Sequence, residues 1–334
     1  MNQPCTEGYI FTVYGKMKYL HHAVTAAYCV RRYDQTRPIA LVCEPQHLAE
    51  LEKHNFAKIF DKTVLLGEGH DSITGFKHNI QEYLIYDRNL FLDSDIILLR
   101  NPDTLWQRLS AFPFTITGSL KADYFFGGKK GFGVVFDYIF KRRERTLKEF
   151  GLTHLSRVQS GMMYVQDAPL AQKVTERAKK FLSSSHLTHF TSRKHESGRQ
   201  LESCEWSLAM AMSDLEIPVF PWLMGAESPQ LDYIDDLVSH DDEFLNTSCV
   251  FYTHPFVYSL RGIKSDWIRR FLIGFFTRLP GFGDYQLVVP YAIHFGWLHQ
   301  KKPFYEFSDR IWGLLTTGII SFENAAEDAR NPHS

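Results

Sequence analysis

Two aspartates stand one residue apart in the apolar run Asn89–Leu98, which reads NLFLDSDIIL. In a strand, successive side chains alternate between faces, so Asp93 and Asp95 are expected to point the same way and Ser94 to point away. Two like charges beside an apolar core repel each other unless a cation neutralises them. Hard divalent ions such as Mg²⁺ and Mn²⁺ take oxygen ligands, including phosphates. The run therefore predicts a metal site for a diphosphate ligand.

Strand-like and helix-like segments alternate around this pair. The expected strands are 9–14, 38–42, 62–66, a segment ending at Asp93, 114–118, 160–165, 218–220 and 249–254; the expected helices are 19–33, 48–54, 76–86 and 202–212. Such alternation is typical of an α/β protein with a largely parallel sheet. Ligands of open α/β sheets bind outside the carboxyl ends of the strands, which is where the two aspartates are expected.

The composition indicates the number of domains and argues against some classes of function, nucleic-acid binding among them. The chain has 334 residues, 44% hydrophobic and 22% charged, which suits one large domain or a domain with an extension. A net charge of −1 provides no global basic field for nucleic acid. Five scattered cysteines without a Cys-x-x-Cys pair fit a reducing cytosol.

The chain ends also suggest a location. The polar N-terminus has no signal-peptide pattern, and no apolar stretch reaches the roughly 20 residues that span a bilayer, so a cytoplasmic protein is expected. After residue 255 the character changes, so we predict a domain over 1–255 and an extension over 256–334. Arginines alternate with bulky apolar residues in 267–278, which makes peripheral contact with the inner membrane surface a candidate role of the extension.

Other segments accompany the aspartate pair in a definite order. They are Phe11–Tyr14, Lys77, Ser160–Met163, Cys204–Leu208, His254 and Gly262–Trp267. In this order, together with Asp93-Ser94-Asp95, they resemble the motifs of glycogenin-type nucleotide-sugar glycosyltransferases of the GT-A fold, over roughly the first four-fifths of the chain. Departures from the family pattern are Gln159 for asparagine, Glu205 for aspartate, Trp206 for an amide, and the missing proline after Lys264.

The resemblance implies a fold and an activity. The fold would be a Rossmann-like, mixed and mostly parallel sheet flanked by helices, with a mainly helical C-terminal extension. The activity would be transfer of a sugar from a nucleoside-diphosphate sugar, UDP-linked by expectation, to a hydroxyl of a glycan, lipid-linked or protein acceptor, with retention of configuration.

The resemblance also implies roles for individual residues. The metal, Mn²⁺ or Mg²⁺, would be bound by Asp93, Asp95 and His254. The donor would contact Thr12, Tyr14, Lys77, Asp93, Ser94, Ser160 and Gly161. Glu205 and Lys264 would act in catalysis, Glu205 on the donor sugar and Lys264 on the charge of the leaving diphosphate.

Each of these residues also has a purely structural interpretation. The aspartates would cap the next element, a lysine on a helix would be solvated, and Glu205 would pair with a helix dipole. An isolated histidine is usually structural, and no motif suggests a function for the other histidines that were considered. These are His21, His22, His70, His240 and His294.

Two other functions remain open from the sequence. An apolar-Asp-x-Asp run also begins the site of haloacid-dehalogenase phosphatases, in which the first aspartate is the nucleophile. Here Ile96-Ile97 follows the pair, and only Gly283-Asp284 suggests the second element of that site. The substitutions at Glu205 and Trp206 also leave a nucleotide-sugar or glycan-binding protein without catalysis as an alternative.

Overall fold

The computed structural model describes residues 6–124, 126–128, 133–192, 202–254, 256–257, 260 and 263–330. The chain forms two compact units, each built from separate stretches of sequence. Unit 1 contains Met1–Gly15, Arg37–Leu92 and Gln107–Pro221, and unit 2 contains Lys16–Thr36, Asp93–Trp106 and Trp222–Ser334. The predicted division at residue 255 falls inside unit 2.

Unit 1 is built around a seven-stranded sheet in the order β3-β2-β1-β4-β7-β6-β8. The strands are β1 (Glu7–Val13), β2 (Ile39–Cys43), β3 (Lys62–Leu65), β4 (Arg88–Leu92), β6 (Phe114–Ser119), β7 (Arg157–Val165) and β8 (Phe220–Pro221). Strands β3 to β4 are parallel, whereas β7 pairs antiparallel with both β4 and β6. The predicted mixed, mostly parallel sheet is confirmed.

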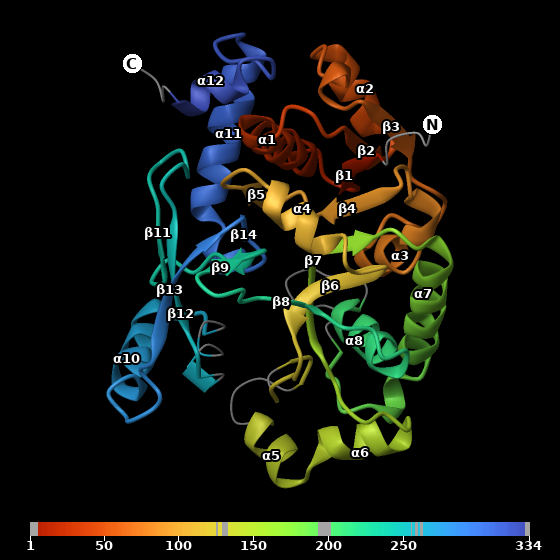
Figure 1. Cartoon of the computed structure of the whole chain (residues 1–334), viewed down its shortest axis with the longest axis vertical. Helices are drawn as coiled ribbons and strands as arrows, with labels where there is room; N and C mark the ends of the chain where they lie inside the picture. Colours follow the sequence, from red (N-terminus) through yellow and green to blue (C-terminus); the bar gives the residue numbers. More distant parts are fainter. Residues whose placement is uncertain are drawn as a thin grey trace. The chain divides into compact units, whose positions relative to one another are not determined.

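Burial explains why the central strands read as continuous apolar runs. All five residues of β2 are buried, and so are the last four of β4. A strand covered by helices on both faces needs no polar alternation, as is usual in parallel sheets. The helices of unit 1 are α2 (Pro45–Lys53), α3 (Ile73–Lys77), α5 (Gly133–Ile139), α6 (Arg142–Glu149), α7 (Ala168–Ser183) and α8 (Glu205–Asp214). Helix α8 packs against both β7 and α7 (Figure 1).

The helix predicted over 76–86 is the clearest difference in unit 1. The structure has α3, which ends at Lys77, and then a separate 3₁₀ turn over Ile80–Tyr83. The Asn79 side chain donates to the Gly75 carbonyl oxygen at 2.7 Å, so it occupies a carbonyl of the first helix at the break. Side chains that bond to nearby backbone in this way compete with helix continuation. Further 3₁₀ turns are Ala57–Ile59, Ser185–Leu187 and Leu298–Gln300.

His78, directly after α3, gives unit 1 an acid-sensitive point. The residue is 2% exposed, its Nε2 lies 3.0 Å from Ser207 Oγ, and burial lowers the pKa of His78 from 6.5 to about 4. Since the unfolded chain binds a proton more readily than the fold does, the stability that the neutral ring provides is lost as the pH falls from 6.5 toward 4. As the pH falls from 6.5 to about 5, we expect the free energy of unfolding to decrease by roughly 2 kcal/mol because of this ring.

Urea titrations at several pH values measure this effect. The His78→Gln variant should show a flatter dependence of unfolding free energy on pH than the wild type. Replacing the exposed His186 with glutamine is the matched control and should leave the slope unchanged. Equal slopes for His78→Gln and the wild type would show that His78 is not the titrating group.

Unit 2 combines two small sheets with helices. One sheet has the order β10-β14-β5 and the other β11-β12-β13-β9. Its strands are β5 (Ile96–Leu98), β9 (Glu227–Ser228), β10 (Leu231–Asp232), β11 (Val238–Ser239), β12 (Ser248–Tyr252), β13 (Tyr285–Pro290) and β14 (Ala292–His294); its helices are α1 (Lys18–Tyr33), α10 (Asp266–Phe276), α11 (Lys302–Thr316) and α12 (Ala325–Arg330). Helix α1 packs against β5, α11 and α12. Helix α4 (Asp103–Leu109) spans the boundary between the units.

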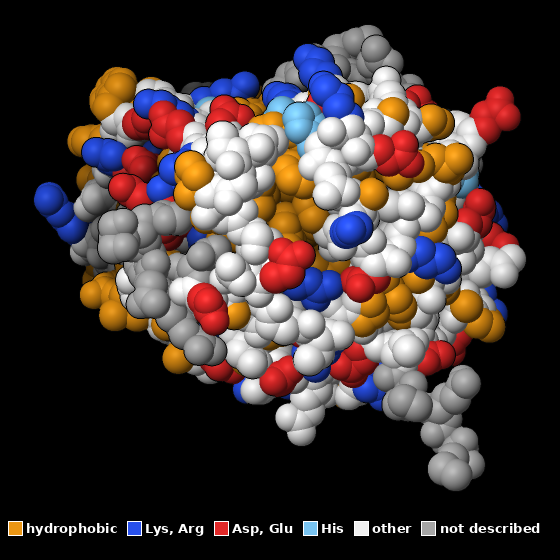
Figure 2. Space-filling model, turned by 90° about the horizontal axis from the view of Figure 1, so that it is seen from above, with side chains coloured by type: hydrophobic (Ala, Val, Ile, Leu, Met, Phe, Trp, Pro, Cys, Tyr) orange, Lys and Arg blue, Asp and Glu red, His pale blue; other side chains and the backbone are white. Residues whose placement is uncertain are grey.

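The C-terminal region is mainly helical, as predicted, but it also supplies β13 and β14, which the sequence did not lead us to expect. Residues 258–259 and 261–262, in the first part of the predicted extension, where we expected a loop that closes the active site, lie outside the described residues. Within the described part of the chain, none of the helices has the length and apolar character needed to cross a bilayer. The face drawn in Figure 2 mixes acidic, basic and apolar side chains.

Candidate metal centre

The aspartate pair occupies the turn that connects β4 to β5. Strand β4 ends at Leu92, β5 begins at Ile96, and the Ile96 N–H donates to the Asp93 carbonyl oxygen at 3.2 Å. The predicted strand geometry at this point is therefore wrong, because a turn and not strand alternation orients the side chains. The predicted convergence is confirmed: one oxygen each of Asp93 and Asp95 and a nitrogen of His294 all lie within 4.8 Å of one another.

Strand pairing brings His294 to this turn. Strand β14 lies between β10 and β5, with His294 opposite Ile96 on one side and opposite Asp232 on the other. The Phe295 N–H donates to the Asp95 carbonyl oxygen at 2.9 Å, which extends this pairing into the turn. Residues far apart in the sequence are thus fixed next to one another by backbone hydrogen bonds within unit 2.

The two nitrogens of His294 face different partners. Nδ1 lies 3.1 Å from Asp232 Oδ1, while Nε2 lies 3.4 Å from Asp95 Oδ1 and 3.7 Å from Asp93 Oδ2. The Trp297 indole N–H donates to the other oxygen of Asp232 at 3.1 Å. Asp232 is therefore fixed by its own partner and orients the imidazole toward the aspartate pair, an arrangement common behind metal-binding histidines.

Gly296 leaves room for this ring. A Cβ atom at residue 296 would lie 2.7 Å from Cε1 of His294, closer than real Cβ contacts. Any larger residue would push the imidazole away from its partners, so the glycine is required by the close approach of ring and backbone.

Cationic side chains neutralise the carboxylates in this structure. The Lys301 ammonium pairs with Asp95. Burial disfavours the charge of Asp95, but the charges of Lys301 and His294 hold the pKa of its carboxyl far below the usual range. Burial likewise disfavours imidazolium, yet the hydrogen bonds and charges of Asp232 and Asp95 raise the pKa of His294 to about 10. The cationic side chains of Lys301 and His294 lie among three carboxylates, those of Asp93, Asp95 and Asp232. This arrangement strongly favours positive charge.

The donor atoms here fit a hard or borderline divalent ion. Two carboxylates supply oxygens, and the Nε2 atom of His294 supplies a nitrogen. An imidazole together with carboxylates suits Mn²⁺ better than Ca²⁺. A metal ion and a proton compete for the same imidazole nitrogen, so binding of the ion requires His294 to release its proton.

The role of Asp232 leads to a direct prediction. In the Asp232→Asn variant the side chain keeps its size but loses the charge that orients His294, so Mn²⁺ affinity should fall roughly 10- to 100-fold. Isothermal titration of the wild type and the variant with Mn²⁺ measures the change. The exposed Asp284 provides a matched control, since its replacement by asparagine should leave the affinity unchanged. Unchanged affinity in Asp232→Asn would show that the ring is held without it.

His254, the predicted third ligand, has a different environment. Its ring stacks on Phe282 with centroids 4.0 Å apart, and its Nδ1 accepts a long hydrogen bond from the Phe256 N–H at 3.3 Å. In the described part of the chain, the structure groups Asp93 and Asp95 with His294 and not with His254. Lys264, expected to follow the histidine in the site, is exposed at the start of the segment that leads into α10.

Two of the predicted donor-site residues, Lys77 and Ser160, meet in unit 1. The Lys77 ammonium donates to the carbonyl oxygen of Ser160 at 2.6 Å and to its hydroxyl at 3.0 Å, and Ser160 Oγ lies 3.4 Å from Cys204 Sγ. Lys77 is buried at the end of α3, so the structural interpretation of a solvated helix lysine does not apply to it.

The other predicted residues of unit 1 lie in β1, β7 and α8 or directly after β1. Thr12 is part-exposed near the end of β1, and Tyr14 follows the strand and packs against the hydrophobic core. Glu205 is the first residue of α8, and Gly161 is buried within β7. Trp206 is buried and stacks on Phe190 with centroids 4.8 Å apart, so it serves the core.

The sequence alone does not single out His294, Asp232 or Lys301. A signal for His294 does exist, because it ends the apolar run 287–293 much as Asp93 ends its own. The pair Lys302-Pro303 shortly afterwards also supplies the lysine–proline pair that is missing after Lys264. Asp232 has no such signal, since its role depends on the pairing of β10 with β14.

Comparison with known proteins identifies the fold. No protein-family model matches the chain, and no curated protein matches it by sequence. Among solved structures, an active-site mutant of LgtC aligns over 96% of this chain and 99% of its own, with 12% identity and a TM-score of 0.50. The glycosyltransferase GlyE of Streptococcus pneumoniae, at 13% identity and a TM-score of 0.49, covers 97% of this chain, which spans 64% of the GlyE chain. Mouse xyloside xylosyltransferase 1 aligns over 68% of this chain and 88% of its own, with 13% identity and a TM-score of 0.44. The chain has the GT-A glycosyltransferase fold.

Proposed function

We propose that this protein is a metal-dependent glycosyltransferase that uses a nucleoside-diphosphate sugar. The observation that carries the proposal is the convergence of Asp93, Asp95 and His294 directly after β4 in a chain of GT-A fold. LgtC, whose fold this chain shares, is described as a galactosyltransferase and is known with donor and acceptor sugar analogues. This supports glycosyl transfer over the phosphatase alternative.

The proposed metal, Mn²⁺ or Mg²⁺, is held by Asp93, Asp95 and His294. When bound, it supplies a Lewis acid that offsets the charge of the leaving diphosphate. Asp232 orients His294 for this purpose, and Lys301 adds a positive charge beside Asp95. For Lys77 and Lys264 we propose the role that the sequence predicts, which is to offset phosphate charge.

The donor is proposed to be a UDP-sugar. Thr12 and Tyr14 are assigned to the nucleotide, and Ser94, Ser160 and Gly161 to the rest of the donor. Glu205 is assigned to the donor sugar, where a carboxylate stabilises the positive charge that develops at the anomeric carbon. An acceptor hydroxyl on a glycan, lipid-linked or protein substrate then attacks that carbon, and we propose that configuration is retained.

Contact of the C-terminal region with a membrane surface is part of the same proposal. Helix α10 supports it, because Trp267, Phe271 and Phe275 recur at helical spacing and are all exposed. Such a stripe of exposed aromatic residues is suited to the boundary between lipid headgroups and acyl chains.

A thermal-shift panel of nucleotide sugars, with and without Mn²⁺, tests the function. We expect one UDP-sugar to raise the melting temperature only when Mn²⁺ is present, because a ligand that binds the folded state alone stabilises it. Turnover of that donor, followed as release of UDP, separates an enzyme from a binding protein. No metal-dependent shift with any nucleotide sugar, or phosphatase activity on a simple phosphomonoester, would overturn the proposal.

A further inference from the structure

Helix α5 presents an uncharged apolar face to solvent. Val135, Phe136, Tyr138 and Ile139 are 50–63% exposed, and Phe140, the next residue after the helix, is 50% exposed. The two buried residues of α5, Val134 and Asp137, face inward. Exposed apolar residues are ordinary when scattered singly, whereas a contiguous group of this kind marks an interaction surface.

Helix α6 follows α5 directly and presents a basic face. Arg142, Arg145 and Lys148 are exposed and recur every three residues, so they share one side of the helix. Lys141, the residue before the helix, is exposed as well, and of the two acids of α6 Glu149 is exposed and Glu144 partly exposed. Among the described residues, the one ion pair found for these four cations joins Arg142 to Asp137 at 3.4 Å.

Other residues of α6 contact the rest of unit 1. Arg143 lies over the Tyr124 ring at 4.1 Å and donates to the Ala122 carbonyl oxygen at 2.7 Å. Glu144 accepts a hydrogen bond from the Tyr124 hydroxyl, and Thr146 is buried. The basic face is thus held outward by contacts on the inner side of the helix.

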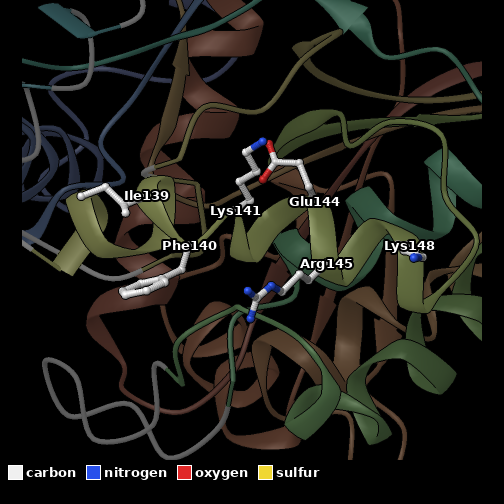
Figure 3. Close-up of a pocket in the computed structure, with 6 residues that line it drawn as sticks. All are labelled: Ile139, Phe140, Lys141, Glu144, Arg145 and Lys148. Carbon is white, nitrogen blue, oxygen red and sulfur yellow. The ribbon is translucent and has the colours of Figure 1, made fainter.

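A surface hollow of about 340 Å³ lies where the apolar and basic faces meet. It is lined by Ile139, Phe140, Lys141, Glu144, Arg145 and Lys148. Figure 3 shows Phe140 and Arg145 extending to one side of the two helices, and Lys141 and Glu144 extending to the other. An aromatic ring beside a guanidinium provides an apolar wall next to a donor for phosphate oxygens.

We propose that the hairpin formed by α5 and α6 docks on an anionic lipid surface. The apolar face of α5 would enter the headgroup boundary, and the cations of α6 would meet lipid phosphates, the combination that interfacial basic amphipathic elements use. A second copy of this chain fits less well, because a symmetric dimer pairs a patch with itself and would bring the basic faces of α6 toward each other. This proposal does not depend on the glycosyltransferase assignment.

Co-sedimentation of the full chain with phosphatidylcholine vesicles, with and without phosphatidylglycerol, tests the proposal. The variant Lys141→Gln/Arg145→Gln/Lys148→Gln should lose roughly 100-fold in partitioning onto phosphatidylglycerol vesicles. The matched control is Lys53→Gln/Lys173→Gln/Lys180→Gln, which removes the same charge from exposed positions outside the hairpin and should bind as the wild type does. Phe136→Ser/Ile139→Ser should weaken binding as well.

The same experiments distinguish docking on an anionic lipid surface from formation of a dimer. Changes of exposed apolar residues outside the hairpin and outside α10, such as Leu65→Ser/Leu187→Ser, should leave binding to phosphatidylglycerol vesicles unchanged. The proposal is overturned if the wild type binds neither vesicle, if the α6 variant partitions like its control, or if sedimentation equilibrium finds a dimer that Phe136→Ser/Ile139→Ser dissociates while vesicles are not bound.

Discussion

Replacing Asp95 with asparagine is expected to abolish Mn²⁺ binding and to lower donor turnover by roughly 10³-fold or more. Asp95 offers one oxygen to the group that it forms with Asp93 and His294, and its carboxylate is the partner of the buried Lys301. An amide keeps the shape of the side chain but not the charge that attracts the ion. Isothermal titration with Mn²⁺ and an assay of donor hydrolysis measure the two effects.

Stability must be separated from this loss, because Asp95→Asn leaves Lys301 buried without its counter-charge. Breaking a buried pair from one side costs roughly 3–5 kcal/mol. The double variant Asp95→Asn/Lys301→Gln restores the charge balance, so it should fold better than Asp95→Asn and still bind no Mn²⁺. The exposed Asp103→Asn serves as a control in the same unit. Full activity in a folded Asp95→Asn variant would sink the assignment.

The second large effect is expected at His294. His294→Ala removes the nitrogen ligand and the link to Asp232, so Mn²⁺ affinity should fall by roughly two orders of magnitude or more and donor turnover with it. His254→Ala should leave Mn²⁺ affinity near that of the wild type, because the His254 ring stacks on Phe282 and lies outside the ligand group. The two histidines belong to the same unit, which makes each the natural control for the other.

Mn²⁺ titrations of both variants decide between the structure and the sequence motif. If His254→Ala loses the metal and His294→Ala keeps it, the arrangement of unit 2 around the ion differs from the one described. Both variants should be checked for unchanged thermal unfolding, since a buried histidine also contributes to packing.

The aspartate pair illustrates how far the sequence alone reaches. The apolar run before Asp93 predicts β4 because a buried strand has a clear composition, and the carboxylates follow it at the expected place. The detail of strand alternation does not hold, because the hydrogen bond from Ile96 to Asp93 closes a turn. The place of the pair directly after β4 is thus readable from the sequence, and its local geometry is not.

The histidine beside the aspartate pair shows the opposite case. His254 stands in the order that the family resemblance implies, whereas His294 is close to the aspartates only through the pairing of β14 with β5. That pairing joins segments roughly 200 residues apart in the sequence, and no local pattern encodes it. For the same reason the sequence did not divide the chain into its two discontinuous units.

Anomalous diffraction at the manganese edge, from crystals grown with Mn²⁺ and UDP, tests the central claim most directly. We predict a strong peak coordinated by Asp93, Asp95 and His294 and by phosphate oxygens of UDP. Absence of a peak at these residues in crystals that contain both ligands, or a peak coordinated by His254 in place of His294, would contradict this account of the metal centre.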